Sequence, residues 1–495
     1  MKRFLTLIVG TFSCLFVSAS FDMNENMQNA YLSIIDLKFN EGIRFIEAEK
    51  KQNPNNGLIY LNENYKDFLE LIIGEDKQLF DKISSNKSKR LSAIEKCDKT
   101  SPYYLYAKAE INLQWAFARL KFQEYFLAAY EIQKAYFLLE ENQKKFPDFH
   151  LNKKGMGLLH CLIGSIPENY QWIVNAIGIN GGIDKGLNEL NELLSLTDQD
   201  KNYQIYNTEL LFLISFLEMN LTIEKSNFQK TLDAIGKKYQ QHLLLNFAAA
   251  RLTSKLGKNE LTIEILKNRP KNKGQFDFAY LEYLQGMSAL YLLKPTAKQH
   301  FLSFIQHFKG QNYIKSAYQK LAWIAFLNND FEKRDVYFEM VKQRGTSYLD
   351  EDKQAQKQAE TGEISHHFLL RSRLFYDGGY YKKTLLELEK IESPHLFSNT
   401  ENTIEYWYRK ARVFQKMEKP IMEVISSFRK ALDIELTSNS YYTPMSALQI
   451  AIEYEKIGEK QKAKSYYNKC LSMKDFDYQR GIHQKAKAGL NRIAN

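Results

Sequence analysis

Several residue types that mark particular protein classes are scarce in this sequence. Its 495 residues include nine prolines, four tryptophans and four cysteines. The cysteines, at positions 14, 97, 161 and 470, lie far apart, and no Cys-x-x-Cys occurs. This spacing excludes a disulfide framework, a dithiol redox motif and a clustered zinc clamp. Long Gly/Ser-rich or Pro-rich linkers are missing too, so we expect one continuous array of elements and not a set of tethered domains.

Catalytic and metal-binding motifs are also missing. There is no His-Glu-x-x-His and no Gly-x-Ser-x-Gly, and the glycine run from Gly178 to Gly186 lacks the spacing of a phosphate loop. His300 and His307 could share a helix face, but Phe304 lies on it and favours packing. Acidic residues mostly alternate with lysines and are not paired in loops, as a glycosidase would need. We therefore predict a protein without enzyme activity, cofactor or metal.

The charge is basic but dispersed. The formal net charge is +10, with 25% charged, 14% aromatic and 44% hydrophobic residues, which is a globular composition. The densest basic cluster is short and consists of Lys87, Lys89 and Arg90. Because lysines elsewhere are mixed with Glu and Asp, we interpret them as solvated helix surface and predict no nucleic-acid partner.

The first 19 residues have the pattern of an export signal. Lys2 and Arg3 precede an apolar run from Phe4 to Val17, and Ala19 ends a Val-Ser-Ala sequence suited to signal peptidase. An uncleaved anchor is one alternative, and a lipoprotein through Cys14 is another, although Thr11-Phe12-Ser13 is a poor lipobox. We expect cleavage near Ala19, a mature chain without a transmembrane helix, and a location in the bacterial periplasm or at the periphery of the outer membrane or cell surface.

The stretch from Ser446 to Met473 contains two short amphipathic patterns separated by a glycine. Gly458 can end the first helix in a left-handed conformation. Apolar residues recur at helical spacing on both sides of it, namely Ala447, Ile450, Ala451, Tyr454, Ala463, Tyr467 and Cys470. A hairpin this short cannot bury its apolar face alone and needs similar neighbours. The alternation of small and aromatic residues around a glycine turn resembles the tetratricopeptide repeat (TPR).

Similar patterns recur from Ser316, Glu363 and Thr403, and looser ones appear further upstream. We therefore predict an all-α fold, a TPR-like α-solenoid of antiparallel helix pairs forming a right-handed superhelix. The alternative is an antiparallel helical bundle without a true repeat. The predicted organisation is a signal peptide (1–19), an N-terminal helical array (20–154), a Gly-rich irregular helical segment (155–200) and TPR-like repeats (201–495, clearest over 316–495).

The segment from Gly155 to Leu194 carries seven glycines. Its pattern resembles the tetratricopeptide-repeat 39 family, also called the inclusion-clearance outer-membrane family in fungi. The matching residues are Gly157, Ser165, Pro167, Gly178, Gly182, Gly186 and Leu187. This resemblance implies a helical-repeat fold and a scaffold-like role in protein or lipid handling, without catalytic residues. The export leader departs from that eukaryotic family.

In a TPR superhelix the first helix of each pair lines the concave side, and residues between its core positions face the groove. The matched repeats place there Gln319, Trp323, His366, Arg373, Tyr376, Tyr408, Arg412 and Gln415. Arginine grips carboxylates and carbonyl oxygens, and tyrosine offers a flat amphipathic contact, which suits peptide recognition. We predict a non-enzymatic scaffold or adaptor that binds a protein or peptide of the cell envelope in this groove, with peripheral association with the outer membrane as a second hypothesis. The alternative is a glycan- or nutrient-binding outer-membrane protein of a sugar-uptake system.

Overall fold

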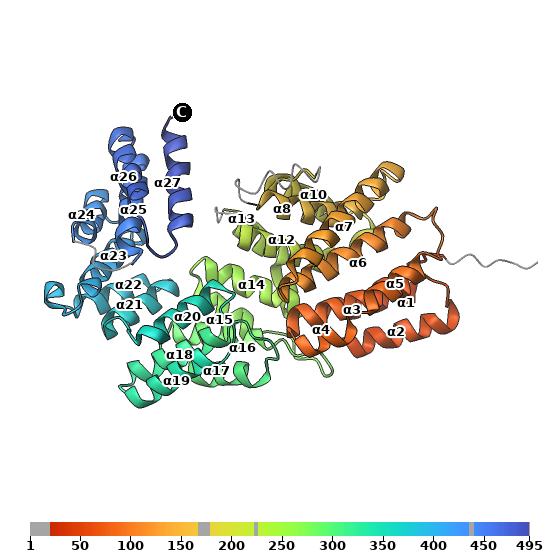
Figure 1. The fold of residues 1–495 in the computed structure, drawn as a ribbon, viewed down its shortest axis with the longest axis horizontal. Coiled ribbons are helices and arrows are strands. Elements are labelled where there is room, and N and C mark those ends of the chain that lie inside the picture. Colours follow the sequence, from red (N-terminus) through yellow and green to blue (C-terminus); the bar gives the residue numbers. More distant parts are fainter. Residues whose placement is uncertain (1–19, 167–178, 222–225, 435–439, 495) are drawn as a thin grey trace, which may run out of the picture. The chain divides into compact units, whose positions relative to one another are not determined.

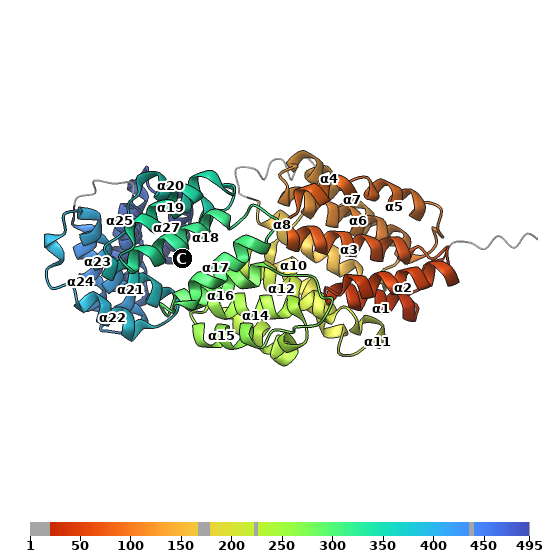
Figure 2. The same ribbon diagram turned by 90° about the horizontal axis from the view of Figure 1, so that it is seen from below.

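The computed structural model describes residues 20–166, 179–221, 226–434 and 440–494. The predictions for the leader, including Cys14, and for Pro167 and Gly178 fall outside these ranges. Within them every regular element is a helix, and successive helices pack as antiparallel pairs (Figure 1, Figure 2). The predicted all-α fold of TPR-like helix pairs is confirmed.

The chain divides into two compact units, Met1–Ala249 with Asn268–Phe278, and Ala250–Lys267 with Ala279–Asn495. The helices of the first unit are α1 (Glu25–Ile35), α2 (Phe39–Gln52), α3 (Leu58–Gly74), α4 (Lys77–Ile83), α5 (Asn86–Ile94), α6 (Pro102–Lys121), α7 (Tyr125–Lys145), α8 (Asn152–Gly164), α10 (Ile183–Leu196), α11 (Lys201–Gln204), α12 (Asn207–Leu221) and α13 (Ser226–Ile235).

Helix α14 (Leu243–Lys255) contains the boundary between the two units. The second unit continues with α15 (Asn259–Lys267), α16 (Tyr280–Leu290), α17 (Thr296–His307), α18 (Ile314–Leu327), α19 (Phe331–Gln343), α20 (Asp350–Thr361), α21 (His367–Asp377), α22 (Tyr381–Glu389), α23 (Thr400–Lys416), α24 (Ile421–Leu432), α25 (Tyr442–Lys456), α26 (Lys460–Ser472) and α27 (Gln479–Ala494).

Helices α25 and α26 form the hairpin that the sequence pattern predicted. Gly458 follows α25 with a φ of 76°, in the left-handed region. All seven apolar residues of the pattern are buried and belong to one hydrophobic core. Helix α27 covers the end of this core, since a Cβ on Gly489 would lie 2.2 Å from Cζ of Tyr467. The hairpin is therefore stabilised by neighbours on both sides.

The glycines between Gly155 and Leu194 let α8 and α10 touch through their backbones. A Cβ on Gly186 would lie 2.3 Å from the carbonyl oxygen of Gly157 and 2.5 Å from Sγ of Cys161. A Cβ on Gly164 would lie 2.6 Å from the amide nitrogen of Ile183. The described part of the segment thus uses its glycines for close helix packing.

Two turns far apart in sequence also meet through glycines within the second unit. Gly257 lies between α14 and α15, and Gly379 lies between α21 and α22. A Cβ on Gly379 would lie only 1.8 Å from the carbonyl oxygen of Gly257. Beside this contact, Nδ2 of Asn259 donates to the hydroxyl of Tyr380 at 3.0 Å, and that hydroxyl donates to Oε1 of Glu260 at 3.1 Å. Two hairpins that are not neighbours in the chain are thereby joined.

Helix α20 was not predicted, because only Ala355 and Ala359 give it an apolar face. It is held largely by polar contacts to α18. The buried carboxylate of Asp352 accepts the backbone N–H groups of Tyr313 at 2.7 Å and Ser316 at 2.9 Å, which caps the N-terminus of α18. Nζ of Lys315 on α18 in turn donates to Oε1 of Gln356 at 2.8 Å.

Replacing Gly186 tests the close approach of α8 and α10. Gly186→Ala should lower the free energy of unfolding by about 1–3 kcal/mol, because the contacting atoms include backbone that cannot move aside. Gly481→Ala on α27 is the matched control, since no heavy atom lies within 4 Å of its added Cβ. It should raise the free energy of unfolding by about 0.5–1 kcal/mol. Urea unfolding followed by circular dichroism measures the free energy of unfolding of both variants. An equal change in the two variants would contradict the close approach of α8 and α10.

The Asp352 cap predicts a specific pH dependence. Burial raises the pKa of Asp352 to about 6, although the two backbone N–H groups act in the opposite direction. The folded state therefore binds the proton more tightly than the unfolded state, so this group's contribution to stability is largest at low pH and is lost as pH rises through about 6.

Asp352→Asn cannot ionise and should remove this dependence. Between pH 4 and pH 7.5 the free energy of unfolding of the wild type should fall by about 2–3 kcal/mol more than that of the variant. Urea unfolding of both proteins at the two pH values gives this difference in the free energy of unfolding. The contributions of all other titrating groups are the same in both proteins and cancel. Parallel pH profiles would show that Asp352 has an ordinary pKa.

Candidate functional site

The second unit contains a groove of about 890 Å³. Its walls come from α14, α16, α18, α20 and α21, from the segments around the starts of α23 and α25, and from Asp477 and Tyr478 before α27. Most of these elements are first helices of hairpins, which is the position expected for the concave side of a helical repeat. The groove lies wholly within one compact unit, and we take it as the candidate binding site.

Tyrosines line much of the groove: Tyr280, Tyr283, Tyr291, Tyr313, Tyr441, Tyr442 and Tyr478. Tyr280, Tyr283 and Tyr442 are buried, whereas Tyr478 is 47% exposed. Burial raises the pKa of Tyr283, Tyr313 and Tyr442 well above the usual value. These hydroxyls therefore remain neutral and can both donate and accept hydrogen bonds, as Tyr283 does with Oγ of Ser316 at 2.8 Å.

Charged residues of both signs face the groove. The cations are Arg251, Lys320, Lys357 and Arg373, and the carboxylates are Asp350, Glu351, Glu363, Asp377, Glu401, Glu405 and Asp477. Lys357 of α20 pairs with Asp477 at 2.8 Å, across 120 residues of sequence. Glu405 pairs with Arg409, whereas Arg373 approaches Asp377 only to 3.8 Å. Such a surface suits a ligand that carries charge and hydrogen-bonding groups.

Three of the eight predicted groove residues lie in its wall, namely Gln319, Trp323 and Arg373. Helix α20 modifies their surroundings. Nε2 of Gln319 and Nε1 of Trp323 both donate to Oε1 of Gln358, at 2.6 and 2.8 Å. Trp323 is only 3% exposed, so its ring belongs to the wall and offers little surface to a ligand.

The other five predicted residues are not among those that line the groove: His366, Tyr376, Tyr408, Arg412 and Gln415. Tyr408 is buried in the hydrophobic core around α23 to α26. Arg412 donates to the hydroxyls of Tyr376 at 3.0 Å and Tyr408 at 3.3 Å, and Gln415 donates to Glu453 of α25 at 2.7 Å. These five side chains therefore lie outside the lining of the groove, and their role in binding stays a prediction. Only residues at the start of α23 line the groove, so residues further along that helix bind neighbouring helices instead.

His366 precedes α21 and lies beside the groove. Its ring is close to those of His367, Phe368 and Phe397, with centroid distances of 4.5, 5.6 and 5.1 Å. Burial, together with the charge of His367, lowers the pKa of His366, so its imidazole is neutral at pH 7. The preceding residue, Ser365, does line the groove and donates to Glu405 at 2.6 Å.

Lys320, Glu405 and the tyrosine pair at the start of α25 line the groove but were not predicted to do so. Lys320 could have been found, because it lies four residues after Ser316 on a helix and three before Trp323, so all three share one face. Tyr441 and Tyr442 gave no comparable signal. They precede the matched part of the last hairpin, and their position depends on where α25 begins.

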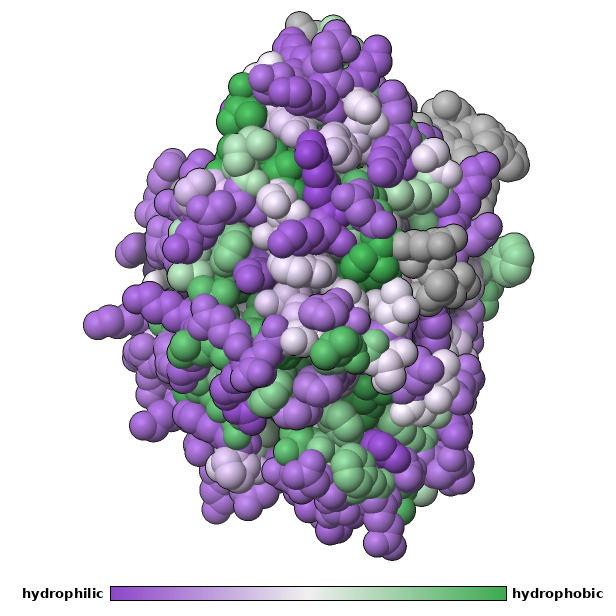
Figure 3. All heavy atoms as spheres, turned by 90° about the vertical axis from the view of Figure 1, so that its left-hand side faces the viewer, coloured by the Kyte–Doolittle hydropathy of each residue, from purple (hydrophilic) through white to green (hydrophobic). Residues whose placement is uncertain are grey.

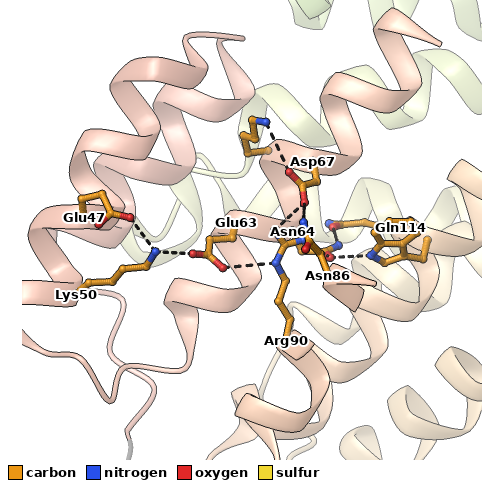
Figure 4. A network of polar contacts seen from close by, with 10 residues as sticks. Glu47, Lys50, Glu63, Asn64, Asp67, Asn86, Arg90 and Gln114 are labelled. Carbon is orange, nitrogen blue, oxygen red and sulfur yellow. Dashed lines mark hydrogen bonds and ion pairs between the residues drawn. The ribbon is translucent and has the colours of Figure 1, made fainter. Parts of the chain in front are cut away.

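The first unit has a smaller cavity of about 400 Å³ between α2, α3 and α5. Its charges are matched in a network (Figure 4). Lys50 bridges Glu47 and Glu63 at 2.7 Å each, and Arg90 binds Asp67 at 2.7 Å and Asn64 at 3.1 Å. Because the buried Arg90 already has its acidic partner, we interpret this network as one that joins helices.

Neither a metal centre nor a membrane-spanning helix is found within the described ranges. No group of three or more His, Cys, Asp or Glu residues is arranged there to hold a metal ion. Nor does any helix in those ranges combine the length and apolar character needed to cross a bilayer.

No family model matches the chain, and no curated protein sequence matches it. Among solved structures it is similar to yeast Tom70, at 12% identity over 94% of this chain and 95% of Tom70, with a TM-score of 0.24. It is also similar to the structure of Naa15/Naa10 bound to HypK-THB, at 13% identity over 94% of this chain and 66% of that one, with a TM-score of 0.23. The fold is defined by the antiparallel helix pairs of the chain itself.

Proposed function

We propose that the groove of the second unit binds a segment of another protein, so that the chain acts as a non-enzymatic adaptor. The observation that carries this proposal is one continuous groove in which tyrosine hydroxyls, amides and charges of both signs face the same space. Backbone amides and mixed side chains of a polypeptide need that combination of donors, acceptors and charges. The volume suits a short extended segment and not a whole domain.

Exposed apolar residues outside the groove are the alternative docking sites, and α7 of the first unit carries several, including Tyr125, Phe126, Leu127 and Tyr130. The face of the molecule in Figure 3 is largely hydrophilic, and its hydrophobic residues lie in small groups. On that face no broad apolar area competes with the groove as a docking site.

The glycan-binding alternative receives less support. Sugar rings stack on exposed aromatic faces, as cations and bases do. Of Trp323 and the seven groove tyrosines, only Tyr478 is largely exposed. The remaining rings are buried or half-buried in the walls and offer little aromatic surface for stacking.

We further propose that the adaptor works in the bacterial cell envelope, at the periphery of the outer membrane or free in the periplasm. The support is the leader-like pattern of residues 1–19. The described fold begins directly after it, where the carbonyl oxygen of Ser20 accepts the N–H of Gly57 at 2.8 Å and Phe21 packs against Gly57. A mature chain starting at Ser20 would keep these contacts.

A photo-crosslinker tests the groove. Gln354 of α20 lines it, and Gln343 at the end of α19 is an exposed glutamine outside it. With benzoylphenylalanine at position 354, irradiation in the producing cells should attach a defined protein segment, which mass spectrometry identifies. The same residue at position 343 should not give that product. Identical products at both positions, or none at 354, would refute binding in the groove.

The leader is tested by the mass of the full-length gene product made in a bacterial host. We expect a mature chain that begins at Ser20 and is recovered from the periplasm or the envelope. Ala19→Lys should block cleavage, because signal peptidase needs a small residue at this position. A lipid-modified chain starting at Cys14 would support the lipoprotein alternative, and an unprocessed wild type in the cytoplasm would refute export.

A further inference from the structure

Two of the buried cations of the described chain, Lys315 and Lys320, form no ion pair within 4.0 Å among the described residues, and of these only Lys320 lines the groove. Arg90, Lys154 and Arg409 each form an ion pair with a carboxylate. Lys315 donates to the carbonyl oxygen of Val341 at 2.6 Å and to Gln356. Lys320 is 8% exposed, lines the groove and forms no ion pair within 4.0 Å among the described residues. Its ammonium donates to Oε1 of Gln319 at 2.5 Å.

Two further cations, Arg251 and Arg373, line the same groove. The ammonium of Lys320 and the guanidinium of Arg373 lie 3.9 and 5.0 Å from the centroid of the Trp323 ring. Arg251 of α14 donates to the hydroxyl of Tyr280 at 3.4 Å and has no ion pair in the part of the chain that the structure describes. Arg251, Lys320 and Arg373 all line the same groove, as does Tyr291, whose pKa burial raises while the charges of Arg373 and Arg251 act to lower it.

The carboxylates near Lys320 do not compensate for the missing ion pair, because the pKa of its ammonium stays low. Burial and then the charge of Arg373 lower the pKa of Lys320 to about 7, while Glu351, Asp377 and Asp352 act against them. Burying an ammonium beside another cation is unfavourable unless an anion comes close. A cavity whose wall holds such a group is therefore prepared for a negative charge.

We propose that Arg251, Lys320 and Arg373 hold a carboxylate of the bound segment, so that the groove selects a segment with an acidic side chain or chain end at this point. This inference rests on the proposed function, which places a protein segment in the groove. A carboxylate suits the site better than a phosphate, because the nearby Glu351 and Asp377 oppose a doubly charged ligand.

Fluorescence anisotropy with three labelled peptides tests the proposal on the full chain. The first peptide, fluorescein-Gly-Ser-Tyr-Glu-Glu-Gly-amide, carries two side-chain carboxylates. The second has Gln-Gln in place of Glu-Glu and carries no carboxylate outside the label, which is common to all three. The third is the Gln-Gln peptide with a free C-terminus, so its peptide part carries only the terminal carboxylate. At least one acidic peptide should bind about 10- to 100-fold more tightly than the Gln-Gln amide. The tighter of the two identifies the source of the carboxylate, and equal affinities, or no binding by any of the three, would overturn the proposal.

Lys320→Met separates recognition from packing. It should abolish the preference for the acidic peptide while the Tm stays unchanged or rises by about 2–4 °C, because an unpaired buried charge is removed. Lys342→Met, an exposed lysine near the end of α19, is the matched control and should preserve the preference. A fall in Tm for Lys320→Met would show that Lys320 serves packing, and would overturn the proposal.

The pH profile gives an independent readout. Affinity of the wild type for the acidic peptide should fall from pH 6 to pH 9 as the ammonium loses its proton. Lys320→Arg stays charged over this range and should remove most of the fall. If the crosslink at position 354 persists but Lys320→Met leaves peptide preference unchanged, the groove still binds its partner and only the carboxylate site is refuted. If the crosslink is also missing, both proposals fail.

Discussion

The structure depends on the close approach of helices that cannot bury their apolar faces alone. Small residues lie where helices meet, as Ala451 and Ala463 do between α25 and α26, and glycines bring the backbones of α8 and α10 into contact. Each hairpin is stable because the next one covers it. The first helices of successive hairpins therefore follow one another along the second unit, and their remaining faces line the groove.

The groove is more than the inner side of a repeat. Helix α20 has little apolar surface, yet Asp352 joins it to the start of α18, and Gln358 binds both Gln319 and Trp323. The aromatic surface that a simple repeat would have offered is therefore replaced by amides and charges. Lys320 lines this polar space without a carboxylate within 4.0 Å among the described residues, and its ammonium donates to Gln319.

The sequence predicted the parts of the fold that follow from helical periodicity. The buried faces of α25 and α26 and the turn at Gly458 were predicted residue by residue. Of the predicted groove residues, Gln319, Trp323 and Arg373 line the groove. Tyr408 and Arg412 do not, because Tyr408 is buried in the core and Arg412 binds the hydroxyls of Tyr376 and Tyr408. Helix α20 has almost no periodic apolar signal, although three acidic residues in its first turn and the left-handed Gly362 after it are marks of helix ends.

The contact between Gly257 and Gly379 distinguishes the second unit from a linear array. In an array each repeat touches only its neighbours, so repeats can unravel one at a time from either end. Here two hairpins separated by about 120 residues share backbone contact and the hydrogen bonds of Tyr380. Loss of either hairpin removes a contact of the other, so the intervening helices should melt cooperatively, and closing this long loop should slow folding relative to an open array of equal length.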